Sequence, residues 1–158
     1  MTLEYLQPAE AQAAFSSGAV DAWDVWSPFV EQADASVLVN GIGYGSNFSY
    51  EVAAKSSIKN PTTAKEISEY LKTLNQAHRW ANKHAAAWAA TWAQATGLPD
   101  SIMTNAAHDD TETPVSVDAQ TTGTPEQSLV DAFSKAALIP KHYSFETFTS
   151  SAFNTAVG

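Results

Sequence analysis

The stretch FSSGAVDAWDVWSP, residues 15–28, decides which fold the sequence predicts. Gly18 is typical of a residue that ends a helix, and the segment 20–25 is predicted as the next strand. Ser27-Pro28 then indicates a helix start, because Ser caps a helix and Pro suits its first turn. We expect a ligand close to Trp23 and Trp26, since a parallel sheet binds ligands at the carboxyl ends of its strands.

Helical and extended segments alternate on both sides of this stretch. A helix is expected from Pro8, and further strands are expected at residues 3–6, 36–39 and 50–55. Strands that alternate with helices indicate a parallel sheet with crossover helices. The predicted fold class is therefore α/β.

The chain changes character near Pro61, after which the pattern predicts helices alone. Apolar residues there recur every three or four positions, which is the spacing of one face of a helix. The helices are expected to begin at Asn60-Pro61, shortly before Trp88, at Asp100 and at Thr124. We predict two parts: residues 1–56, which form part of an α/β lobe and return to a hinge, and residues 57–158, a helical C-terminal portion.

Composition excludes several classes of function. The net charge is −9, from 17 acidic and 8 basic residues, whereas nucleic-acid binding needs a basic surface. The chain has no cysteine, so disulfides and cysteine-type zinc sites are excluded. No apolar run reaches the roughly 18–20 residues that span a bilayer. The first residues, MTLEYLQP, do not resemble a signal peptide.

The sequence lacks catalytic and cofactor motifs, so we expect neither an enzyme nor a cofactor. The segment NGIGYGSN, residues 40–47, does not have the glycine spacing of a dinucleotide site, and no long helix follows it directly. No nucleophile elbow or metal-binding histidine pair is present. His108-Asp109-Asp110 is typical of a solvated polar loop, and we expect no metal there.

Several motifs in order along the chain resemble the solute-binding proteins of ABC transporters that import aliphatic sulfonates, taurine and nitrate. The resemblance extends from about Leu3 to about Tyr143, and the aliphatic-sulfonate branch is the most similar. The motifs are YLQPAEAQAAFSSGAVDAWDVWSPFV at 5–30, VAAK at 52–55, Asn60-Pro61, ATGLP at 95–99 and LIPK at 138–141. In the first motif the matching residues are Leu6, Pro8, Glu10, Ala11, Phe15, Gly18, Val20, Asp21, Ala22, Trp26 and Pro28.

This resemblance implies the C-terminal half of a type II periplasmic-binding-protein fold, with the N-terminal half outside this chain. It also implies a periplasmic or extracellular, membrane-associated receptor that binds a small anionic or zwitterionic ligand in an interlobe cleft and contacts ABC permease subunits. Nitrate and thiamine-precursor-like ligands stay open as alternatives. A further alternative is an oligomerising interaction module, because half a fold leaves sheet edges and apolar faces uncovered.

Five residues are the predicted ligand contacts. Trp26 matches the family's Trp, and its indole either covers the alkyl part of a ligand or packs in the core. Asp24 departs from the family; it either favours a ligand that also carries a cation, such as an amino-sulfonate, or is a solvated carboxylate. Tyr44 and Asn47 lie in the glycine-rich segment, which is either a mobile cleft loop or an ordinary connection. Ser49 matches a Ser of the sulfonate-binding pattern.

Overall fold

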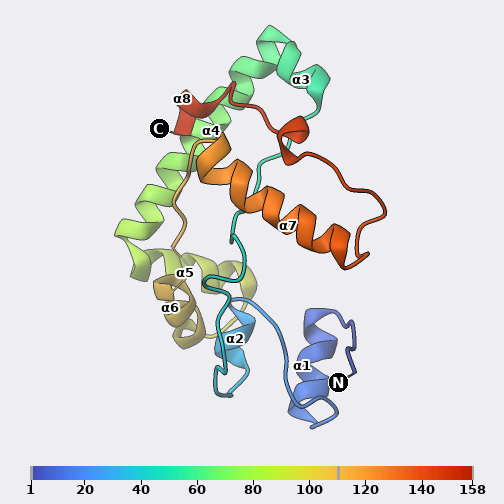
Figure 1. Ribbon diagram of the computed structural model, residues 1–158. Helices are drawn as coiled ribbons and strands as arrows, with labels where there is room; N and C mark the ends of the chain where they lie inside the picture. Colours follow the sequence, from blue (N-terminus) through green and yellow to red (C-terminus); the bar gives the residue numbers. More distant parts are fainter. Residues whose placement is uncertain (1, 110, 158) are drawn as a thin grey trace. The chain divides into compact units, whose positions relative to one another are not determined.

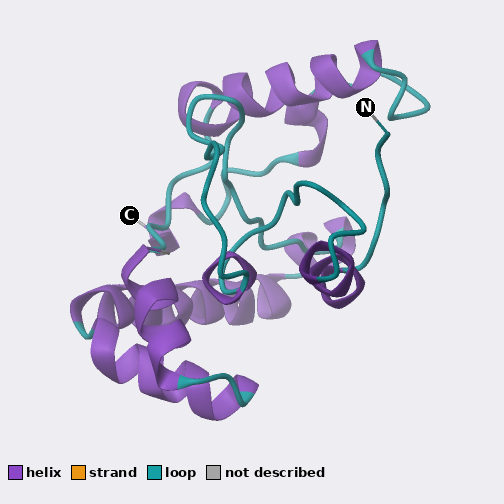
Figure 2. Cartoon of the chain, turned by 90° about the horizontal axis from the view of Figure 1, so that it is seen from below, coloured by secondary structure: helices purple, strands orange, loops and turns teal. Residues whose placement is uncertain are grey.

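The computed structural model describes residues 2–109 and 111–157, and helices are its regular elements (Figure 1). In chain order they are α1 (Pro8–Ser16), α2 (Phe29–Gln32), α3 (Lys55–Lys59), α4 (Pro61–Lys83), α5 (Ala85–Thr96), α6 (Asp100–Asp109), the π-helix η1 (Ala119–Gly123), α7 (Thr124–Lys135), the 3-10 helix η2 (Phe145–Phe148) and α8 (Asn154–Val157). Figure 2 draws the same chain in helices and loops only, with no strand among the described residues.

The prediction of an α/β fold with a parallel sheet is therefore wrong. Residues 20–25 and 36–39 are non-helical but do not pair, and the segment predicted as a strand at 50–55 leads instead into α3. Within the described residues, no backbone hydrogen bond joins residues 21–25, 36–39 or 50–53 to a neighbouring segment. Their apolar and β-branched residues suit a strand, but a strand also needs a neighbour for its N–H and C=O groups.

Helix ends lie beside Gly18 and Gly97, and a helix starts after Asn60, whereas the predicted Ser27 cap is wrong, because α2 begins at Phe29 and the Ser27 hydroxyl donates to Glu31 instead. Gly18 follows α1 with a φ of 74°, and Gly97 ends α5 with the same φ of 74°. This left-handed conformation costs glycine little because it has no Cβ. Asn60 caps α4 with its side-chain oxygen, which accepts from the Thr62 N–H at 3.0 Å and from the Thr63 N–H at 3.1 Å.

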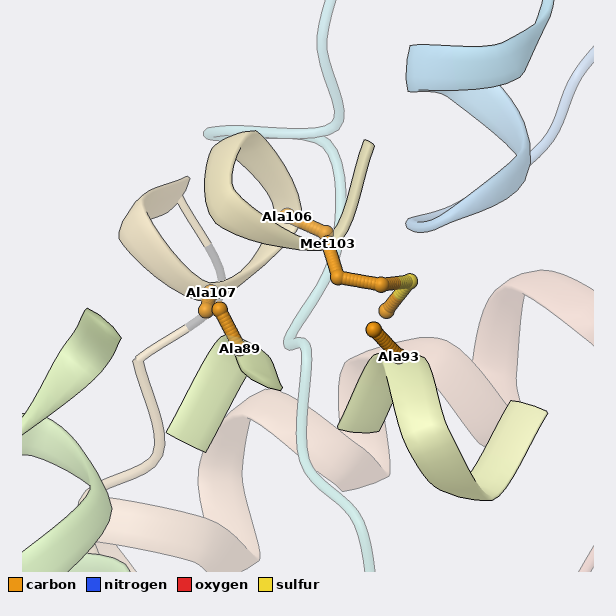
Figure 3. Packing of buried hydrophobic residues seen from close by; sticks show 5 residues of the cluster. All are labelled: Ala89, Ala93, Met103, Ala106 and Ala107. Atoms are coloured by element: carbon orange, nitrogen blue, oxygen red, sulfur yellow. The ribbon is translucent and has the colours of Figure 1, made fainter. Parts of the chain in front are cut away.

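The chain divides into two compact units. The first contains residues 1–38 and 81–111, and the second contains residues 39–80 and 112–158. The core of the first unit lies between α5 and α6 and is built from small side chains around one large one. Figure 3 shows Met103 of α6 directed towards Ala93 of α5, and Ala107 beside Ala89. Met103 has no exposed surface, and the small alanines let the two helices approach closely.

In the second unit, side-chain amides make several of the contacts between segments. The Asn154 amide accepts from the Val117 N–H and donates to the Val117 carbonyl, both at 3.0 Å. The Asn75 amide donates to the Val157 carbonyl at 3.1 Å, which joins α4 to α8. These contacts satisfy backbone groups that no sheet satisfies, so side-chain amides replace strand pairing here.

Met103 gives a direct test of the first unit's core. Met103→Ala removes a fully buried side chain, so the free energy of unfolding is expected to fall by about 2–5 kcal/mol. Urea unfolding followed by circular dichroism measures the change. Leu3→Ala is the control: Leu3 lies in the same unit with 64% of its surface exposed, and the expected change is within about 0.5 kcal/mol. Equal effects of the two changes would contradict this core.

Candidate functional site

An aromatic cluster in the first unit separates the roles of the two tryptophans in the opening motif. The Trp23 ring lies between two others, with its centroid 6.3 Å from that of Phe15 and 6.4 Å from that of Phe29. Among the described aromatic rings, Trp26 contacts only that of Phe29, edge-on, at 6.1 Å and 90°. Trp23 is half-buried, whereas 66% of Trp26 is exposed. Trp23 therefore packs inside the cluster, and Trp26 presents an indole face to solvent.

Asp24 lies beside this exposed indole in the sequence, and it is exposed as well. The turn after it is fixed by a hydrogen bond in which the Ser27 hydroxyl donates to Glu31 at 2.7 Å. An apolar face and a carboxylate so close in the chain suit a ligand with an alkyl part and a cationic group.

The glycine-rich segment belongs to the second unit and is anchored there by a buried carboxylate. Glu126 of α7 is only 8% exposed, and the Ser46 hydroxyl donates to it. The Tyr50 phenol also reaches this carboxylate, while its ring packs 6.2 Å from Phe48 and 5.7 Å from Phe145. A buried carboxylate needs such donors, because an unpaired charge in the interior is costly.

The surroundings of Tyr50 in this anchor also change its pKa. Partial burial of the phenol, followed by the negative charge of Glu126 and their hydrogen bond, raises the pKa of Tyr50 from 10.0 to about 12. All three causes disfavour the phenolate or favour the phenol, so they act in one direction. Tyr50 is therefore a neutral donor at any physiological pH.

The predicted contacts Tyr44, Asn47 and Ser49 are exposed on this anchored segment. Tyr44 is 82% exposed, which leaves its phenol accessible to a ligand. The side chains of Ser46 and Tyr50 both hydrogen-bond to Glu126 of α7. Tyr44, Asn47 and Ser49 therefore lie on or beside a short stretch that is fixed at two points. The structure thus brings Tyr44, Asn47 and Ser49 together in the second unit and places Asp24 and Trp26 in the first.

Two open hollows lie elsewhere in the described chain. The larger, of about 530 Å³, is in the second unit; its lining includes Asp118, Thr122, Glu146, Ser150 and Asn154. Its Asp118 carboxylate accepts from the N–H groups of Gln120 and Thr121 at 2.9 and 2.7 Å. These bonds, first of all those with Thr121, lower the pKa of Asp118 and cap η1. The polar groups of this hollow therefore serve the local fold, and none of the predicted contacts lines it.

The smaller hollow, of about 300 Å³, is in the first unit and is lined by Val30, Glu31, Val37, Asn105, His108 and Asp109. His108 Nδ1 lies 3.0 Å from the Asp109 carboxylate. Among the described residues no three acidic or histidine side chains gather as a metal site would require. Asp110, the third residue of the motif considered in the sequence, lies outside the described residues.

Two curated proteins are similar to this chain, and each is named "Putative aliphatic sulfonates-binding protein". The one from Escherichia coli (strain K12) is 29% identical over 144 residues, which covers 87% of this chain and 44% of that protein. The one from Bacillus subtilis (strain 168) is 36% identical over 91 residues, which covers 53% of this chain and 26% of that protein. The chain is similar to sulfonate-binding proteins.

The chain spans less than half the length of these two relatives. Both are named as binding proteins and neither as an enzyme, which fits the absence of catalytic motifs from the sequence. The similarity to the E. coli protein leaves only about an eighth of the chain outside it. No family model matches the chain, and no solved structure matches it.

Sequence reasoning missed the anchor made by Ser46, Tyr50 and Glu126. Glu126 lies two residues after Thr124, where the sequence predicts a helix start, and acidic residues commonly lie in such a first turn. Its partner Ser46 is 80 positions away, and no local pattern reports such a pairing. The one available signal is the composition around Ser46: a run of hydroxyl and amide side chains with no charge of its own suits a buried carboxylate.

The raised pKa of Tyr50 makes the anchor testable. The alkaline titration of phenolate absorbance is expected to contain a component near 12 that Tyr50→Phe removes and Glu126→Gln moves towards 10. The folded state disfavours the phenolate, so Tyr50 stabilises the fold fully below pH 10, and this stabilisation is lost as the pH rises through 12. Tyr5→Phe, in the other unit, is the control. An unchanged titration near 12 in Tyr50→Phe would contradict the assignment.

Proposed function

We propose that this chain is part of a solute-binding protein that captures a small organic sulfonate, either an alkanesulfonate or a taurine-like amino-sulfonate. The similarity to two aliphatic sulfonates-binding proteins carries this proposal, because one match extends over most of the chain. The function is binding without chemistry. The ABC importer, its permease subunits, the interlobe cleft and an extracytoplasmic location belong to the same proposal. No described helix has the length and apolar character needed to cross a membrane.

The proposed ligand contacts are Trp26, Asp24, Tyr44, Asn47 and Ser49. Their side chains match the parts of such a ligand. Tyr44, Asn47 and Ser49 offer neutral hydrogen-bond donors to sulfonate oxygens, and a hydrogen bond to a charged group contributes about 1.5–3 kcal/mol. The exposed Trp26 indole offers an apolar face to the alkyl chain. The division of the chain at residue 56, with a helical C-terminal portion after it, stays part of this proposal, but without a sheet in the first part, since the described residues form none.

Calorimetric titration of the protein that carries this sequence tests the function. Ethanesulfonate, taurine, nitrate and sulfate are titrated separately at constant ionic strength. We expect heat with one of the two sulfonates and less or none with sulfate, because sulfate lacks the alkyl part that Trp26 would cover. Heat with nitrate alone would replace the sulfonate assignment, and no heat with any of the four would contradict it.

Trp26 is the contact whose loss is easiest to measure. Trp26→Ala exposes the two carbons of ethanesulfonate, one methyl and one methylene group, and burial is worth about 0.8 kcal/mol for each, so the Kd is expected to rise about tenfold. Trp26→Phe keeps an aromatic face and is expected to retain most of the affinity. Tyr5→Ala, which also removes an exposed aromatic ring (85% exposed) from the first unit, is the control. Equal affinities of Trp26→Ala and wild type would remove Trp26 from the site.

Asp24 is expected to set the preference between ligands rather than the overall affinity. Asp24→Asn removes the carboxylate that faces a taurine ammonium group, and a charge pair at 4 Å in water is worth about 1 kcal/mol, or about fivefold in Kd. Taurine is therefore expected to bind about fivefold more weakly, and ethanesulfonate equally or more tightly. The matched control is Asp21→Asn, an exposed acid three residues earlier. If both variants change the two affinities by the same factor, Asp24 does not select the ligand.

A further inference from the structure

The buried carboxylate of Glu126 serves a segment outside its own helix. Glu126 is the third residue of α7, a position from which a glutamate commonly accepts from the N–H of the residue before the helix. That N–H, of Gly123, donates to the Asp118 carbonyl at 2.9 Å instead. Glu126 is nonetheless only 8% exposed, and burying a carboxylate is costly unless donors surround it. The reason for its position therefore lies with its partners elsewhere in the second unit.

Two side chains of one short stretch meet at this carboxylate. The Ser46 hydroxyl donates to Glu126 from one end of the stretch, and the Tyr50 phenol donates to it from the other. We call the residues from Ser46 to Tyr50 the anchored stretch. Two of the proposed ligand contacts, Asn47 and Ser49, lie between its ends. A single buried carboxylate therefore fixes both ends of the stretch that carries them.

The next residue of α7 supports the anchored stretch indirectly. Gln127 Oε1 accepts from the Phe145 N–H at 2.8 Å, and Gln127 Nε2 donates to the Tyr143 carbonyl at 3.2 Å. The Phe145 ring, whose backbone is fixed in this way, packs 5.7 Å from the Tyr50 ring, and the Phe48 ring packs 6.2 Å from it. All of these residues belong to the second unit. Tyr50 is thus held by its ring as well as by its hydroxyl.

We propose that Glu126 is a positioning residue of the ligand site: its carboxylate holds the anchored stretch in the conformation that binds the ligand, without contacting the ligand itself. This inference rests on the proposed function, because Asn47 and Ser49 are ligand contacts only if the protein binds a sulfonate. A stretch that is already fixed loses less conformational freedom when a ligand binds, so the anchor strengthens binding. Ordering the backbone of a single residue costs enough free energy to change the Kd about tenfold.

Calorimetric titration of the whole protein that carries this sequence measures the effect on affinity, with ethanesulfonate or taurine, whichever the wild type binds. Ser46→Ala and Glu126→Ala are each expected to raise the Kd about tenfold, because the stretch must then be ordered on binding. Ser46→Thr keeps the hydroxyl and is expected to keep the affinity. Two controls are expected to leave the Kd unchanged: Ser128→Ala removes another hydroxyl from α7, and Glu66→Ala removes an exposed acid from α4.

The double variant Ser46→Ala/Glu126→Ala distinguishes positioning from a general loss of stability. If Glu126 and Ser46 act as one pair, removal of the hydroxyl has little further effect once the carboxylate is absent. The double variant is then expected to bind about as weakly as Glu126→Ala alone, whereas independent effects would multiply to about a hundredfold. If Glu126→Ala does not fold, Ser46→Ala and Ser46→Thr decide the question at a half-buried position.

A measurement without ligand follows the anchored stretch directly. Chymotrypsin cleaves after aromatic residues, and its cleavage after Phe48 or Tyr50 reports local opening of the stretch. Cleavage after Tyr70 of α4 serves as the internal reference, since opening of the whole unit speeds both. Ser46→Ala and Glu126→Ala are expected to speed cleavage within the stretch relative to this reference, and Ser128→Ala is expected to leave the ratio unchanged.

Three outcomes would overturn this proposal: a Kd that neither Ser46→Ala nor Glu126→Ala changes, effects that multiply in the double variant, and cleavage of the stretch that rises only in step with cleavage after Tyr70. A wild type that binds neither sulfonate contradicts the proposed function, and with it the role of Glu126 towards a ligand. The cleavage ratio needs no ligand, so it still shows in that case whether Glu126 holds the stretch. Failure of the anchor and failure of the proposed function are therefore distinguishable.

Discussion

The backbone's need for hydrogen-bond partners governs this structure. A helix satisfies its N–H and C=O groups within one segment, whereas a strand depends on a second segment beside it. The described residues contain helices whose sequences carry their own caps and packing faces, such as α4 with its Asn60 cap and α5 with its seam of alanines. Segments that suit strands, such as 36–39, find no partner and stay extended. The same constraint explains why side-chain amides, and not strand ladders, join the parts of the second unit.

Helix boundaries could be predicted from the sequence because local chemistry sets them. Gly18, Asn60 and Gly97 each act within a few residues, and the structure places helix ends beside all three. The sheet could not be predicted in the same way. Apolar character and β-branching in residues 20–25 and 36–39 show that a segment fits a sheet, but they say nothing about whether a second segment is present to pair with it. The α/β prediction inferred that strands pair from the preference of single segments for the strand conformation.

In the candidate site, too, some features are visible in the local sequence and others depend on the fold. The sequence placed both Trp23 and Trp26 close to a ligand, whereas the structure separates them, with Trp23 between two rings of an aromatic cluster and Trp26 at its margin. The glycine-rich segment was recognised as a place for polar contacts, but not as a segment fixed at Ser46 and Tyr50. That property comes from Glu126, whose burial depends on how α7 packs. A contact between residues 80 positions apart is a property of the fold and leaves no local trace in the sequence.

The acidic character of the chain and an anionic ligand are compatible because the acids are unevenly distributed. Beyond about 8 Å, charges on a protein surface are largely screened at physiological ionic strength, so a sulfonate responds to its immediate surroundings and not to the net charge of −9. Tyr44, Asn47 and Ser49 lie in a run of sixteen residues without a charge. The carboxylate that anchors this run to α7, that of Glu126, is buried and already accepts from the Ser46 hydroxyl. Neutral donors bind a monovalent anion without the cost of desolvating a lysine or arginine. The proposed contacts Tyr44, Asn47 and Ser49 are therefore neutral hydrogen-bond donors within an uncharged run, and Glu51 is the carboxylate that follows it in the sequence.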